Sequence, residues 1–155
     1  MAQEHWLVHL VHGDSEVLLT LCDVLGAAGF QVSASSDAIT ALVFIARAKP
    51  RAILCRWEMS EMEGPAFIGM VKKVSPESRV IMCSRRADGP MYEQTLNLGG
   101  ADLIQEPLSS LAVLQAVTRL TGLGIPYAPT EKVRSFDLDA QSSGGEAKSG
   151  RSSVS

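Results

Sequence analysis

Three histidines near the amino end are the first residues that could do chemistry. His5, His9 and His12 carry imidazole nitrogens, which are common ligands of zinc and other transition metals. A metal centre needs several converging ligands, and no cysteine or glutamate stands near these histidines at the spacing of a zinc motif. We therefore expect ordinary strand and loop histidines, and no metal site.

The cysteines could in principle form a redox pair. Cys55 and Cys83 fall at equivalent places near the ends of two apolar segments, while Cys22 stands apart. No neighbouring residue in the sequence is of a kind that would clearly lower a thiol pKa. Widely spaced cysteines inside apolar segments are typical of buried cytosolic thiols, so we expect small core residues instead of a disulfide framework.

Two basic pairs, Lys72-Lys73 and Arg85-Arg86, could contact nucleic acid. They have no interleaved aromatic residues, and 14 Lys and Arg against 17 Asp and Glu give a formal net charge of −3. Proteins that bind nucleic-acid phosphates or anionic lipid carry a basic surface. We expect solvated faces, with neither nucleic acid nor membrane as a partner. The amino end has no signal peptide pattern, which favours a cytoplasmic protein.

The elements that position these residues follow from the apolar pattern. Short apolar runs alternate with segments whose apolar residues recur at helical spacing, and Asp, Ser, Gly and Pro mark the boundaries. Five such units in strict alternation predict an α/β fold, with a doubly wound parallel sheet covered by helices on both faces. The strands are expected at 6–11, 30–34, 52–55, 80–83 and 103–104, each followed by a helix.

The domain organisation follows from length and composition. A chain of 155 residues with 46% hydrophobic content is large enough for one domain with its own core, which we place at residues 1–124. The remainder, 125–155, becomes rich in Ser and Gly towards its end and is expected to be disordered, because it cannot bury enough apolar surface to offset the ordering entropy.

The polar residues that follow the strands form the candidate site. In an open α/β sheet, ligands bind beyond the carboxyl ends of the strands. The loops at those ends hold His12-Gly13-Asp14, Arg56-Trp57-Glu58, Ser84-Arg85 and Glu106-Pro107.

Four stretches in these regions carry a resemblance to a known family. They are the first strand and its turn, 10–17; the loop Met59-Ser60-Glu61-Met62-Glu63-Gly64; the strand 80–84, which ends in Ser; and Gly99-Gly100-Ala101-Asp102-Leu103-Ile104-Gln105-Glu106-Pro107. In order and spacing they resemble the receiver domains of bacterial response regulators, over about residues 6–121. The resemblance implies a flavodoxin-like sheet in the order 2-1-3-4-5, and Met59 and Met62 as packing residues.

The chain departs from the family at the residues that accept a phosphoryl group. The resemblance implies an aspartate nucleophile at the position of Arg56, and a guanidinium is no nucleophile. The acidic pair that would hold Mg²⁺ is replaced by His12 and Gly13, and Asp14 lies one residue beyond. The lysine that would contact the phosphoryl group is replaced by Glu106.

Three further positions complete the comparison. The aromatic residue of the family's switch is replaced by Leu103, whereas Ser84 matches the family's hydroxyl residue and Pro107 is retained. The chain is thus expected to be a phosphorylation-independent pseudo-receiver without enzymatic activity or cofactor. It would act in signal transduction by contact with a protein: a histidine kinase, another receiver or an output domain. The family's partner surface corresponds to about residues 90–121.

Alternatives remain open at this point. A flavodoxin-like sheet could bind a small ligand such as a flavin or nucleotide, although the chain has neither a P-loop nor a Gly-x-Gly-x-x-Gly turn. A regulator modified at another hydroxyl, such as Ser84, is a further possibility. Arg56 and Glu106 either form a permanent salt bridge, expected to be partly exposed, or face solvent independently as remains of a lost site.

Overall fold

A computed structural model describes residues 6–122 of the chain; His5 and the expected tail, 125–155, lie outside the described residues. Within the described part, five strands alternate with five helices, as the apolar pattern predicts. The strands are β1 (Leu7–Val11), β2 (Gln31–Ser35), β3 (Ala52–Arg56), β4 (Arg79–Ser84) and β5 (Asp102–Gln105). The helices are α1 (Ser15–Ala27), α2 (Ala38–Ala48), α3 (Gly64–Val74), α4 (Gly89–Asn97) and α5 (Ser110–Thr121).

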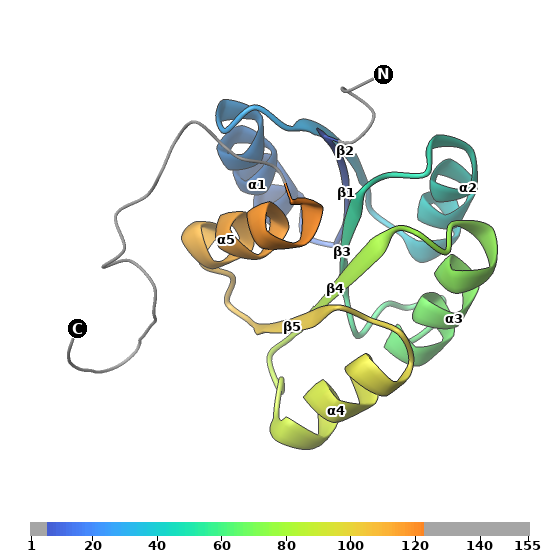
Figure 1. Cartoon of the computed structure of the whole chain (residues 1–155). Coiled ribbons are helices and arrows are strands. Elements are labelled where there is room, and N and C mark those ends of the chain that lie inside the picture. Colours follow the sequence, from blue (N-terminus) through green and yellow to red (C-terminus); the bar gives the residue numbers. More distant parts are fainter. Residues whose placement is uncertain (1–5, 123–155) are drawn as a thin grey trace, which may run out of the picture. The chain divides into compact units, whose positions relative to one another are not determined.

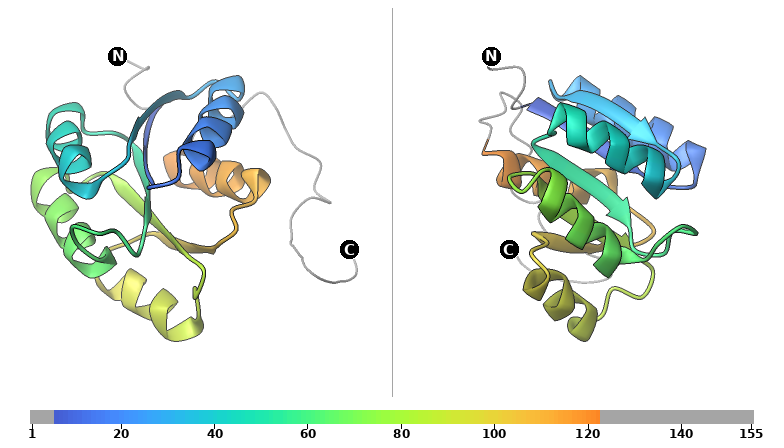
Figure 2. Two further views of the ribbon diagram at one scale, coloured as in Figure 1. Left: turned by 180° about the vertical axis from the view of Figure 1, so that it is seen from behind. Right: turned by 90° about the vertical axis from the view of Figure 1, so that its right-hand side faces the viewer.

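The strands form one parallel sheet in the order β2-β1-β3-β4-β5, which confirms the predicted fold class. Helices α1 and α5 lie on one face, while α2, α3 and α4 lie on the other (Figure 1). The view turned by 90° shows the strands running side by side between the two layers (Figure 2). All carboxyl ends of the strands therefore meet at one edge of the sheet. None of the helices within 6–122 has the length and apolar character needed to cross a membrane.

The helix boundaries follow from residues with known capping preferences. The side chains of Asp14, Asp37, Asp88 and Ser109 each accept a backbone N–H in the first turn of the helix that follows. Helix α3 lacks such a cap but has Pro65 in its first turn, where a missing N–H costs no hydrogen bond. These local signals are the reason why the helices begin within a residue or two of their expected positions.

The core on the α2–α3–α4 side is made of alternate residues of the central strands. Ile53 and Cys55 of β3 pack there with Val80 and Met82 of β4. Met59, Met62 and Leu103 lie partly buried against the same cluster, which confirms that the two methionines are packing residues.

A buried tryptophan closes the loop after β3. Trp57 packs so tightly on Gly64 that a β-carbon at Gly64 would lie 2.7 Å from the indole ring. The glycine that ends the Met59–Gly64 motif is thus required by close approach, and not by an unusual φ.

The first expected strand is one residue too long. Trp6 precedes β1, whose first paired residue is Leu7, opposite Gln31. The Trp6 ring lies 6.4 Å from that of Phe30, which comes directly before β2. The two aromatic residues pack with each other at the ends of the strands instead of joining the ladder.

His9 is a satisfied core histidine, as expected. Its Nδ1 lies 2.7 Å from Ser33 Oγ, its Nε2 lies 2.8 Å from Ser35 Oγ, and its ring stacks on Phe44 at 4.5 Å. Burial lowers the pKa of His9 to about 4, because the interior penalises the charged imidazolium. The side chain therefore remains neutral throughout the physiological range.

This histidine should make the fold acid-sensitive. The unfolded chain protonates His9 below about pH 6.5 whereas the folded chain does so only near pH 4, so the free energy of unfolding falls as the pH falls between these values. His9 alone accounts for a slope of up to about 1.4 kcal/mol per pH unit, which His9→Gln should remove. Urea unfolding at several pH values between 7 and 4 measures the difference. Identical slopes for the two proteins would contradict the assignment.

Candidate functional site

The sequence-predicted site residues come together at the carboxyl edge of the sheet. His12 follows β1, Arg56 ends β3, Ser84 ends β4 and Glu106 follows β5. Backbone hydrogen bonds hold these ends side by side: Trp57 N donates to Cys83 O at 2.8 Å, and Glu106 N donates to Ser84 O at 2.9 Å. The parallel register thus brings the side chains at four strand ends close enough to contact one another.

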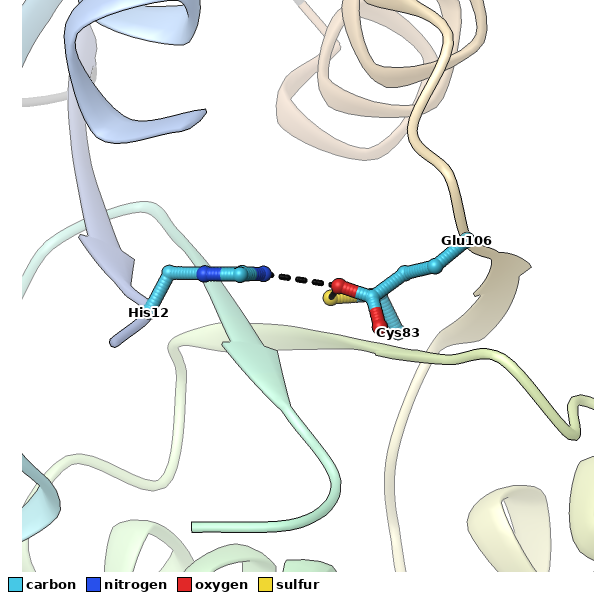
Figure 3. Close-up of side chains that lie close together, drawn as sticks. All are labelled: His12, Cys83 and Glu106. Carbon is cyan, nitrogen blue, oxygen red and sulfur yellow. Dashed lines mark hydrogen bonds and ion pairs between the residues drawn. The ribbon is translucent and has the colours of Figure 1, made fainter. Parts of the chain in front are cut away.

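The Glu106 carboxylate is the centre of the site. Arg56 Nε donates to Glu106 Oε1 at 3.0 Å, so of the two alternatives that the sequence left open the structure has the salt bridge. His12 Nε2 lies 2.7 Å from Glu106 Oε2, and the Cys83 thiol donates to the same oxygen at 3.7 Å (Figure 3). One carboxylate therefore receives three donors from the ends of three neighbouring strands.

The hydrogen bonds of His12 fix its tautomer. The backbone N–H of Asp14 donates to His12 Nδ1 at 3.0 Å, and an amide N–H has no lone pair to accept a proton in return. Nδ1 must then be unprotonated, so the ring proton lies on Nε2, where it is donated to Glu106. In this arrangement His12 accepts one hydrogen bond through Nδ1 and donates one through Nε2.

The charge pair is more buried than expected. The Arg56 side chain is 32% exposed, in line with a partly exposed pair, but the Glu106 side chain is only 9% exposed, because His12 and Cys83 cover it. Burial raises the pKa of Glu106, but the hydrogen bonds from His12 and Arg56 outweigh it, so the pKa lies below its ordinary value. The carboxylate is ionised at neutral pH.

His12, Cys83 and Glu106 have the ligand types of a transition-metal site, and their ligand atoms lie within 4.8 Å of one another. This cluster could not be expected from the sequence, since His12 and Glu106 are 94 residues apart. A histidine that ligates through Nε2 normally carries its proton on Nδ1. Here Nδ1 accepts from Asp14, and the 2.7 Å contact to Glu106 is a hydrogen bond. In this arrangement the three side chains form a hydrogen-bond network in which Glu106 is the acceptor.

The two buried cysteines face opposite sides of the sheet. The register aligns Arg56 with Cys83 and Cys55 with Met82, so Cys55 points to the α2–α3–α4 side and Cys83 to the other. Burial raises the pKa of both thiols, and for Cys83 the carboxylate of Glu106 adds to this effect. Both are protonated core thiols as expected, not a redox pair, while Cys22 is only half-buried.

Glu58 adds a second contact with β4, one that sequence reasoning missed. Its Oε1 lies 3.8 Å from Arg56 Nε, and its Oε2 accepts the Ser84 hydroxyl at 2.7 Å. The position of Glu58 in the loop after β3 places it near the site. Spacing in the sequence alone does not indicate which side chain it contacts. Arg56 thus stands between two carboxylates, one nearly buried and one half-exposed.

The remaining predicted residues lie beside this network. Gly13 is exposed, and a β-carbon there would have no heavy atom within 4 Å. Pro107 follows Glu106 and, with His12, Arg56 and Arg85, lines an open hollow of about 810 Å³. Leu103 does not join the site, because its side chain packs on the core of the opposite face.

A double-mutant cycle measures the Arg56–Glu106 interaction. Arg56→Met leaves a nearly buried carboxylate without a cation, whereas Glu106→Gln leaves a guanidinium that water can solvate. We expect Arg56→Met to cost more, the double variant to resemble Glu106→Gln, and a coupling of about 1–3 kcal/mol at neutral pH. The coupling should disappear as the pH falls through the lowered pKa of Glu106, since protonation removes the charge. Additive effects in urea unfolding at pH 7 would mean that the two side chains do not interact.

Comparisons with known proteins place this site within a family. The model of the response regulator receiver domain matches residues 8–118. Protein-glutamate methylesterase/protein-glutamine glutaminase 1 of Anaeromyxobacter dehalogenans is 36% identical over 102 residues, which are 63% of this chain but 29% of that protein. Chemotaxis protein CheY of Thermotoga maritima is 24% identical over 104 residues, which are 66% of this chain and 87% of that protein.

Solved structures share the fold. A two-component response regulator from Clostridium difficile has a TM-score of 0.69 at 18% identity, and the match covers 74% of this chain and 93% of that one. The beryllofluoride-activated NtrC4 receiver domain has a TM-score of 0.70 at 19% identity, with 75% and 96% covered. At such identities the likeness concerns the fold alone. Taken with the family model, which spans most of the described residues, it leads to one conclusion: the chain belongs to the response regulator receiver domain family.

Proposed function

We propose that this chain is a receiver that signals without being phosphorylated and acts by contact with another protein. The observation that carries the proposal is the salt bridge between Arg56 and Glu106. It joins the two positions at which the family has the aspartate nucleophile and the phosphoryl-binding lysine, with the sign of both charges inverted. A bridge of this kind can hold the site in one state without a phosphoryl group.

The other polar groups of the site are also engaged. Glu106 has three donors, Cys83 is a protonated thiol, and Ser84 is fully buried and bonded to Glu58. None of these groups is a free nucleophile, which supports a binding function in preference to catalysis. The methylesterase named above is a longer protein of which this chain spans 29%, and this match does not assign its activity to this chain.

The proposed partner surface includes the outer side of α4. Tyr92 and Leu96 stand four residues apart on this helix and are each more than 40% exposed, with Leu98 just beyond its end. In the family this region contacts kinases, other receivers and output domains, so we assign the partner to these classes. The match to the transcriptional regulatory protein DctD of Rhizobium meliloti, of which the chain spans 24%, supports an output domain as one candidate.

The second candidate function is binding of a small ligand, which the 810 Å³ hollow favours. Its lining includes Arg56 and Arg85, but also Asp14, Glu16 and Glu106, so no single charge sign is favoured. An absorbance spectrum of the purified protein and a thermal-shift screen of flavins and nucleotides test this possibility. A ligand that raises the melting temperature at micromolar concentration would favour small-ligand binding over protein contact as the function of this chain.

We predict that the protein takes up no phosphoryl group from acetyl phosphate with Mg²⁺. Arg56 offers no lone pair for attack on phosphorus, and Gly13 in place of an acid removes a metal ligand. Intact-protein mass spectrometry should show no added phosphoryl mass, with a receiver of known acceptor activity run in parallel. An acid-labile, Mg²⁺-dependent mass increase would refute the proposal. An acid-stable increase that is lost in Ser84→Ala would support the alternative of a regulator modified at that hydroxyl.

A further inference from the structure

The hydroxyl of Ser84 joins two loops. Ser84 is the last residue of β4 and is fully buried. Its Oγ donates to Glu58 Oε2 at 2.7 Å and accepts the backbone N–H of Arg86 at 3.1 Å. The loop between β4 and α4 is therefore tied, through one oxygen atom, to a side chain of the loop after β3.

That loop holds a strained residue. Ala87 has a φ of 28°, close to the left-handed region that residues with a β-carbon disfavour. Such a conformation persists only where contacts on both sides enforce it. On one side Arg86 N–H bonds to Ser84, and on the other Asp88 caps α4 by accepting Met91 N–H at 2.9 Å.

Glu58 is held in place from its own side. Its carboxylate lies within 3.8 Å of Arg56, which is itself bound to Glu106. Its backbone forms an isolated bridge with Glu63, and the preceding residue, Trp57, donates its N–H to Cys83 of β4. The acceptor for Ser84 is thus a positioned part of the chain.

We propose that Glu58 is a positioning residue that fixes the conformation of the β4–α4 loop by accepting the Ser84 hydroxyl. The hydrogen bond keeps the loop residues Arg86 and Ala87 in one conformation. The start of α4, which follows them, is then held in one position. The exposed apolar face of α4 is then presented in a constant position. This role for the loop follows from the contacts alone; only its effect on a protein partner rests on the proposed function.

Amide hydrogen exchange tests the proposal without a partner or a phosphodonor. Glu58→Ala should accelerate exchange at Arg86 and through residues 85–91 at least tenfold relative to the amides of β1, because the Ser84 hydroxyl loses its acceptor. Glu58→Gln keeps an acceptor oxygen at the same place and should stay within about twofold of the natural protein. Ser84→Ala should match Glu58→Ala, and the double variant should be no faster than Ser84→Ala.

Glu63→Ala is the matched control. Glu63 lies in the same loop, and its side chain makes no cap hydrogen bond to α3, so exchange in 85–91 should not change. Three results would overturn the proposal: unchanged exchange in Glu58→Ala, equal acceleration in Glu58→Gln, or an acceleration that is the same in β1 as in the loop. Each leaves the phosphoryl-transfer experiment unaffected, so failure here is separate from failure of the proposed function.

Discussion

A nearly buried carboxylate is the constraint on which this site depends. An ionised group removed from water is stable only if hydrogen bonds replace its hydration, and Glu106 obtains them from Arg56, His12 and Cys83. Each donor comes from the end of a different strand. The requirements of one side chain therefore engage an arginine, a histidine and a thiol at once, and the carboxylate adds to the effect of burial in raising the pKa of Cys83.

The network that results is saturated at its centre and reaches four of the five strand ends. Arg56 links the Glu106 cluster to Glu58 and, through it, to Ser84. The fifth strand end, that of β2, meets this network through the backbone of His12, whose N–H donates to Ser35 O. The polar groups at the centre of this edge bond to one another, an arrangement that supports the proposed binding function.

The fold could be predicted from the sequence because it rests on local signals. Alternating apolar periods, Asp and Ser caps and Pro65 each act within a few residues, and strict strand–helix alternation leaves few topologies. The Arg56–Glu106 bridge could be named as one of two alternatives, since parallel strand ends meet at one edge, but the sequence did not decide between a bridge and two solvent-facing residues. The contacts of His12, Cys83 and Glu58 could not be predicted, because they depend on side-chain rotamers and on register between residues far apart in the chain. Trp6 was misplaced because an apolar run does not show which residue enters the ladder.

The inverted charges also restrict how the sequence can change. A lysine in place of Glu106 alone would put an ammonium against Arg56 and against the Nε2–H of His12, and an aspartate in place of Arg56 alone would put a third carboxylate beside Glu58 and Glu106. Either single step passes through a protein with uncompensated charge in a half-buried site. For the phosphorylation-independent receiver proposed above, gaining the aspartate and the lysine of the family therefore requires coordinated substitutions at both positions.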